Sequence, residues 1–231
     1  MFKGVLLRAL NDSFSLIVDQ NELSTPKSFQ VVKPNNSKSE VFQELQFLHD
    51  FVQKITILCI SRLHNDEEFD GNVDITKFRN LKKLEINRIP IKQVIGIQQM
   101  RSQLHELICT RSISSIKDLI CSCGGDNSNG FVWNALKVAD LSYNTLTSID
   151  CSLEFAPWLQ ILNLSHNQLT SVDAIKWLPN LKILNISFNC LTFIPIFNIE
   201  AFRRLQILIL TNNFIEDISG NVIKYFWNKL R

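Results

Sequence analysis

The stretch LQILNLSHNQL, residues 159–169, decides the fold, because its leucines recur at fixed spacing around a single asparagine, Asn167. Written as L-x-x-L-x-L-x-x-N-x-L, the pattern returns in LKVADLSYNTL at 136–146, LKILNISFNCL at 181–191 and LQILILTNNFI at 205–215. The starts of the four copies are separated by 23, 22 and 24 residues. Self-similarity at such a period is typical of an array of structural units.

Weaker copies precede these four. LKKLEINRIPI at 81–91 and LHELICTRSIS at 104–114 keep the first half of the pattern, with Ile89 and Ser112 where asparagine is expected, and ITILCISRL from residue 55 is weaker still. This is the signature of leucine-rich repeats, in which each unit contributes a short strand, a turn and a return segment. The sequence therefore predicts an α/β repeat fold, a leucine-rich repeat solenoid of about six to seven units.

The asparagine has a physical explanation at the point where the chain leaves each strand. Backbone groups there lose their ladder partners and must be satisfied in another way. An amide side chain offers both donors and an acceptor, so it can bond neighbouring turns. We expect such a structural ladder at Asn144, Asn167, Asn189 and Asn213.

Two regions follow from this reading, an N-terminal segment with a capping helix over residues 1–54 and the repeats over 55–231. Apolar residues recur at helical spacing in 39–54, which predicts an amphipathic helix that covers the first coil. An independent helical interaction element is the alternative. At the other end, Leu230 stands where a next repeat would begin, so the array continues unless residues 222–227 form a closing helix.

The return segments between the strands are short. Segments such as TSVDAIKWLPN hold one or two helical turns at most. The exception is RSISSIKDLICSCGGD, whose apolar spacing from Ile113 to Ile120 predicts a helix that ends at Gly124 and Gly125.

Composition limits the function classes. The chain has 231 residues, 45% of them hydrophobic, and a formal net charge of +2, which predicts no general attraction to nucleic acid or to anionic membranes. No apolar run approaches the roughly 20 residues that a membrane-spanning helix needs. The first residues make a poor signal peptide, and the six cysteines are scattered. We expect a cytoplasmic protein with reduced thiols.

Side chains at the third and fifth positions of each unit should face outward from the sheet. The third positions of the last four units form an apolar row that we expect to be exposed to a partner: Val138, Ile161, Ile183 and Ile207. The fifth positions add Asp140, Asn163 and Asn185, and small seventh-position residues should keep this face open. The alternative is that β-branched residues simply favour strands.

The eighth position changes in character along the array. It is basic in the early units and aromatic in the later ones: Arg62, Arg88, Arg111, Tyr143, His166 and Phe188. Arginine and aromatic residues carry much of the energy at interfaces, so this edge is a second candidate contact surface. The alternative is that the arginines at this edge are solvated and contact no partner.

Motifs for catalysis, metal binding and nucleic-acid binding are weak. The sequence has no G-x-S-x-G elbow, phosphate-binding glycine loop or H-E-x-x-H spacing, and the four histidines are scattered. Cys121 and Cys123 form a single C-x-C, which more simply closes a helix than binds a metal. We expect no catalytic residue, no cofactor and no metal.

Three segments resemble the N-terminal repeat region of the serine/threonine-protein kinase 11-interacting protein family. They are ELQFLHDFVQKI, ELICTRSISSIKDLICSCGGD and DLSYNTLTSIDCSLEFAPWLQILNLSHNQL, and the likeness extends over about residues 40–215. The resemblance implies a cytoplasmic, non-enzymatic scaffold that binds a serine/threonine kinase and helps to localise it. A regulatory leucine-rich repeat subunit of a phosphatase, or a cytoskeletal adaptor, is the alternative.

Overall fold

The computed structural model describes residues 2–3, 12–14, 36–62, 71–122, 132–194 and 204–216. For residues 2–3 and 36–42 the backbone alone is described. The expected terminal segment at 222–227 and Gly124 and Gly125 lie outside these ranges.

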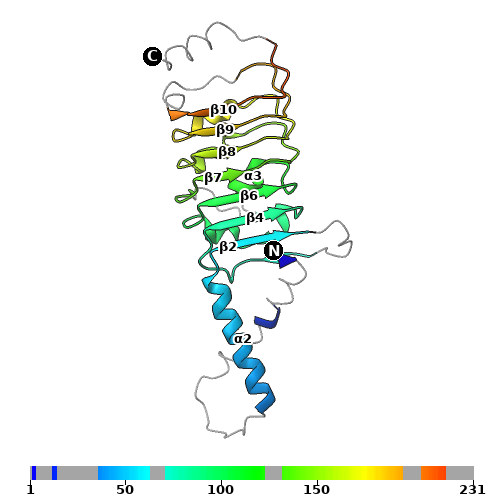
Figure 1. Cartoon of the computed structure of the whole chain (residues 1–231), viewed down its shortest axis with the longest axis vertical. Coiled ribbons are helices and arrows are strands. Elements are labelled where there is room, and N and C mark those ends of the chain that lie inside the picture. Colours follow the sequence, from blue (N-terminus) through cyan, green and yellow to red (C-terminus); the bar gives the residue numbers. More distant parts are fainter. Residues whose placement is uncertain are drawn as a thin grey trace.

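One parallel sheet runs the length of the repeats (Figure 1). Its eight strands follow the chain order: β1 (Phe2–Lys3), β2 (Ile57–Ser61), β4 (Lys83–Asn87), β6 (Glu106–Thr110), β7 (Val138–Asp140), β8 (Ile161–Asn163), β9 (Ile183–Asn185) and β10 (Ile207–Ile209). Equivalent positions of successive repeats pair directly, as in Ile161 with Ile183. A two-stranded sheet joins β3 (Val73–Asp74) to β5 (Val94–Ile95).

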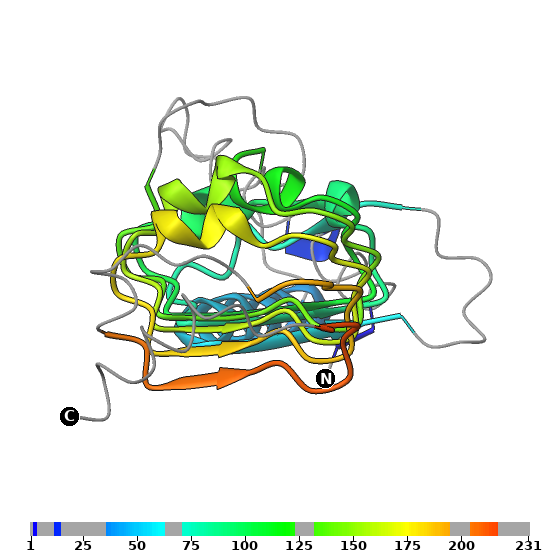
Figure 2. The same ribbon diagram turned by 90° about the horizontal axis from the view of Figure 1, so that it is seen from above.

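Short helical segments in the coils between β4 and β9 lie on the side opposite the sheet, as the view along the long axis shows (Figure 2). They are η1 (Ile91–Gln93), η2 (Ile97–Met100), α3 (Ile116–Ile120), η3 (Cys151–Phe155) and η4 (Asp173–Trp177). The prediction of a leucine-rich repeat solenoid with short return segments is therefore confirmed. The helix predicted from Ile113 is shorter than its apolar spacing suggested, because Ser115 caps it by accepting a hydrogen bond from the Lys117 N–H.

The core is one continuous apolar column between the sheet and the return segments. Inward strand residues such as Leu84, Leu107 and Leu162 are fully buried. Trp133 is buried with them, and its indole N–H donates to the Ile120 carbonyl at 3.0 Å, which ties the segment before β7 to the end of α3. Dense apolar packing of this kind supplies most of the stability of a solenoid.

The asparagines at the ninth position bond one coil to the next through the backbone. The Asn167 amide donates to the carbonyls of Leu141, Leu164 and Ser165, and its Oδ1 accepts from the Leu146 N–H at 3.1 Å. Leu141 and Leu146 belong to the preceding coil. Asparagines at the same position of three other coils make equivalent bonds to the coil before them: Asn144, Asn189 and Asn213.

The helix α2 (Asn36–Lys54) runs along the long axis away from the strands (Figure 1). Among its described side chains, Val52 is buried in the core, and Leu45 and Leu48 pack against it partly buried. Phe51, which the periodicity assigned to the apolar face, is 54% exposed, and Phe47 is 75% exposed. The assignment of Phe51 was wrong, because a helix that projects from the solenoid has no coil beside it.

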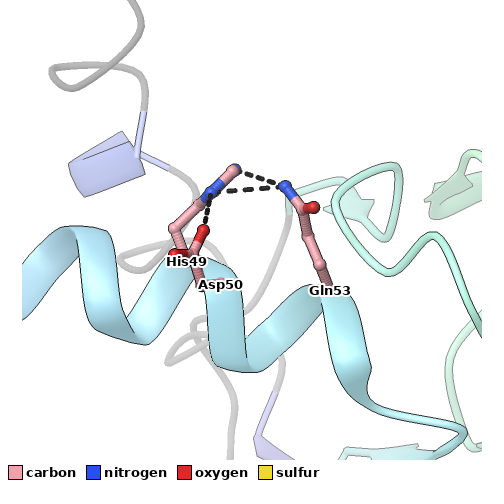
Figure 3. Close-up of polar contacts among 3 residues, drawn as sticks. All are labelled: His49, Asp50 and Gln53. Carbon is pink, nitrogen blue, oxygen red and sulfur yellow. Dashed lines mark hydrogen bonds and ion pairs between the residues drawn. The ribbon is translucent and has the colours of Figure 1, made fainter.

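A small polar cluster lies on α2 (Figure 3). The Gln53 amide nitrogen lies 3.3 Å from Nδ1 and 3.2 Å from Nε2 of His49, and His49 Nδ1 lies 3.8 Å from the Asp50 carboxylate. The buried Phe14 ring meets the imidazole edge-on at 5.3 Å. Phe14 thus packs against α2, and β1 pairs with β2, so residues expected to precede the repeats join the repeat sheet.

Candidate protein-interaction surface

The third-position side chains form a continuous row across four strands. We call Val138, Ile161, Ile183 and Ile207 the apolar row; each pairs with the next in register. Ile207 is 48% exposed, whereas the other three are half-buried between their neighbours. The row faces outward as predicted, but it is less open than expected, because strand spacing of about 4.8 Å lets adjacent side chains cover one another.

An ion pair at the third positions of β4 and β6 separates the apolar row from the third-position residue of β2. The Lys83 ammonium donates to the Glu106 carboxylate at 2.6 Å, from the paired third positions of β4 and β6. This hydrogen bond raises the pKa of Lys83 above its ordinary value. Ile57, the third-position residue of β2, is exposed on the far side of the ion pair. The uninterrupted apolar row on the sheet face therefore begins at Val138.

The fifth-position side chains make hydrogen bonds within the chain. The Asp140 carboxylate accepts from the Ser142 N–H at 2.9 Å and from the Asn163 amide at 3.0 Å. Asn163 accepts from the Ser165 N–H, and Asn185 repeats the same bond one coil later. Each side chain fastens the end of its own strand, so only part of its bonding capacity faces a partner.

The seventh position does not contribute to the open face in five of the coils, where that expectation was wrong, although Asn87 is half-buried and Thr211 is exposed. Its small residues are buried where the chain turns inward at the end of each strand: Ser61, Thr110, Ser142, Ser165 and Ser187. Small side chains are needed there because the adjacent coils leave no room for larger ones.

The eighth position is a left-handed turn residue in coil after coil. Its φ is 58° at Arg88, 52° at Arg111, 55° at Tyr143, 55° at His166 and 53° at Phe188. Most N–H groups at this position donate to a seventh-position carbonyl of the next coil, for example His166 to Ser187 at 3.1 Å. The left-handed conformation was not predictable from the sequence, since no glycine marks it.

These five residues form what we call the turn column. The rings of Tyr143 and His166 stack at 4.1 Å with 8° between their planes, and those of His166 and Phe188 stack at 4.2 Å and 11°. The Arg111 guanidinium carbon lies 5.0 Å from the Tyr143 ring centre. Shared repeat position and strand spacing together were the sequence signal that could have predicted this stack.

Arg62 precedes the turn column by one coil. Its N–H donates to the Asn87 carbonyl at 3.1 Å, just as the Arg88 N–H donates to the Thr110 carbonyl. The structure therefore brings the six predicted eighth-position residues onto one edge, in chain order. Arg88 and Arg111 are exposed on it.

Chemically reactive groups are dispersed over the described part of the chain. Within those residues no three His, Cys, Asp or Glu side chains gather at metal-binding distance, and no helix is long and apolar enough to cross a membrane. Burial raises the pKa of the Cys109 thiol to about 12. Cys121 is half-buried, and Cys123 lies outside the described residues.

Family models match both parts of the chain. Residues 158–178 and 179–222 match two leucine-rich repeat models. Residues 1–64 match the model described as LKB1 serine/threonine kinase interacting protein 1. With the parallel sheet and the repeat register, these matches define a leucine-rich repeat protein.

Curated relatives narrow the comparison further. Serine/threonine-protein kinase 11-interacting protein of Mus musculus is 37% identical over 136 residues, which are 59% of this chain and 13% of the relative. The Gallus gallus protein of that name is 31% identical over 195 residues, 84% of this chain and 18% of the relative. The resemblance seen in the sequence is thus confirmed. The chain spans less than a fifth of the length of these relatives.

A solved structure supports the fold alone. An internalin from Listeria monocytogenes superimposes with a TM-score of 0.51 at 16% identity, covering 77% of this chain and 48% of the internalin.

Proposed function

We propose that this chain is a non-enzymatic interaction scaffold that binds a serine/threonine kinase through the apolar row and the turn column. The apolar row carries the proposal, because four aligned apolar side chains without an intervening charge offer a strip that a protein partner can desolvate. The kinase is named from the relatives, which are called kinase 11-interacting proteins. The same proposal places the chain in the cytoplasm.

A binding measurement with the purified kinase named by the relatives tests the proposal. The double variant Ile161→Asp, Ile183→Asp puts two carboxylates into the centre of the apolar row. We expect affinity to fall by at least about tenfold, because each buried unpaired charge costs more than the lost apolar contact. Far-UV circular dichroism of the variant checks that the repeats remain folded.

A matched control carries the same kind of change elsewhere. Ile95→Asp with Trp158→Asp alters two exposed apolar side chains away from the apolar row, on the two-stranded sheet and before β8. We expect this control to bind the kinase as the unaltered chain does. Equal binding by the apolar-row variant, or no binding by the unaltered chain, would refute the proposal.

A further inference from the structure

The turn column presents its side chains edge-on and in a fixed chemical order. Arg88 and Arg111 occupy two adjacent coils, and Tyr143, His166 and Phe188 occupy the next three. We propose that it binds an extended peptide segment with carboxylate or phosphate groups at one end and apolar side chains at the other. This inference rests on the proposed function, since the segment belongs to the protein partner.

Arg111 lies against the Tyr143 ring while remaining exposed. Its guanidinium carbon lies over the Tyr143 ring, 5.0 Å from the ring centre, which is within the range of a cation–π contact. The in-plane N–H donors, which match a carboxylate or phosphate in paired geometry, stay available at the edge. Because the stack already restricts the side chain, less conformational entropy is lost when an anion binds.

Charge around the column favours an anionic ligand. No described eighth position carries a carboxylate, and Glu106 on the neighbouring face is already paired with Lys83 at 2.6 Å. Glu85 and Asp140 lie three positions before Arg88 and Tyr143, on the sheet face rather than in the turn, and the Asp140 carboxylate already accepts two hydrogen bonds. Four acidic residues that follow Arg62 in the sequence lie outside the described residues, so Arg88 and Arg111 carry the proposal.

The aromatic end suits apolar side chains. Both flat faces of His166 are covered by Tyr143 and Phe188, so the ring edges of the stack remain for contact. Tyr143 and Phe188 are each nearly half exposed. With coils about 4.8 Å apart, the five residues span roughly 19 Å, the length of about six residues of extended peptide.

Fluorescence anisotropy with three labelled six-residue peptides tests this match. One peptide has three glutamates followed by three leucines, one has phosphoserines in place of the glutamates, and one has glutamines. We expect the two anionic peptides to bind the full chain, more weakly at high salt, and the glutamine peptide to bind at least about tenfold more weakly. Binding of the glutamate peptide, the phosphoserine peptide or both identifies the anion that the column prefers.

Paired variants locate the binding on the column. Arg88→Gln with Arg111→Gln should weaken anionic peptide binding roughly tenfold. The control, Arg79→Gln with Lys137→Gln, removes the same charge at the opposite ends of β4 and β7, and should leave binding unchanged. Equal loss in both variants, undiminished binding by the arginine variant, equal binding of the glutamine peptide, or no peptide binding would overturn the inference.

The two proposals fail separately. If the kinase does not bind but the anionic peptides bind in an arginine-dependent way, the proposed partner is wrong and the peptide site stands. If the kinase binds and depends on Ile161 and Ile183 while the peptides show no arginine dependence, the peptide site falls together with the turn column's part in kinase binding, and the apolar row stands.

Discussion

One asparagine in each regular coil satisfies the backbone groups that strand pairing leaves over. The strands of the later coils are three residues long, so most of each coil has no ladder partner. The Asn167 side chain bonds to three carbonyls and one N–H, and two of these four groups belong to the preceding coil. Its amide therefore links coils where the sheet does not.

Replacing Asn167 by alanine should destabilise the chain by about 3 kcal/mol, because buried carbonyls and a buried N–H lose their partners. Urea unfolding followed by far-UV circular dichroism measures the change. The adjacent Gln168→Ala provides the control, since Gln168 is exposed and contributes only its backbone N–H to the coil. Equal stability of the two variants would show that the asparagine bonds contribute nothing net.

Cys109 and Cys151 should react very differently with iodoacetamide at mildly alkaline pH. Cys151 is exposed, whereas burial raises the pKa of Cys109 to about 12 and keeps it a thiol. Mass spectrometry should find Cys151 modified in the folded chain and Cys109 modified only in urea. Rapid labelling of Cys109 without denaturant would contradict its place in the core.

The same thiol makes stability depend on pH in the alkaline range. Its pKa is higher in the folded chain than the ordinary value of 9.0, so the unfolded chain loses its proton first. The contribution is complete below about pH 9 and is lost as the pH rises toward about 12. Cys109→Ser, which does not ionise in this range, should show a flatter stability profile between these limits.

The turn column combines a backbone cost with a side-chain gain. A left-handed φ raises the free energy of the folded state by about 1–2 kcal/mol for each residue with a Cβ. Each stacked aromatic pair lowers it by about 0.5–1.5 kcal/mol. His166 contributes to two such pairs at once. The stacked rings therefore offset the strain of the turns that hold them.

Two substitutions at His166 separate these effects. Alanine and glycine both remove the ring, but only glycine adopts φ near 55° without strain. We expect His166→Gly to be more stable than His166→Ala by about 1 kcal/mol, although both fall below the unaltered chain. Urea midpoints compare them, and an alanine variant at least as stable as the glycine variant would show that the turn is not strained.

Elements covered by the repeat pattern could be predicted from the sequence. Contacts with segments outside that pattern could not. The repeat spacing determined which residues pair across β6 to β10 and which leucines are buried. It could not place β1, which joins the sheet beside β2, or Phe14 against His49, because no repeat pattern covers these residues. The burial of Ser165 and the half-burial of Ile161 follow from neighbouring coils, which a linear pattern does not show.

The described repeats form a stack in which each interior coil is stabilised by the coils on either side. The sheet, the asparagine bonds and the core all connect a coil to its neighbours in sequence. Leu162, in the interior of the stack, is fully buried, whereas Leu208 in β10, the last described strand, is only partly buried. Stability should therefore vary along the long axis.

Leu162→Ala should cost about 3 kcal/mol, because a cavity opens between two coils that cannot close around it. Leu208→Ala should cost about 1 kcal/mol, since that side chain already keeps part of its surface in water. Amide hydrogen exchange compares the two variants strand by strand. Equal loss of protection in both would show that the chain unfolds as a single unit without regional differences.

The left-handed turn also restricts which amino acids this edge can use. Valine, isoleucine and threonine tolerate such a backbone poorly, and the six non-glycine residues found there, from Arg88 to Asn212, all lack a branch at Cβ. All six of these residues also carry a planar group, which is a guanidinium, an aromatic or imidazole ring, or an amide. Substitutions to valine, isoleucine or threonine at this edge should therefore be selected against at the level of folding.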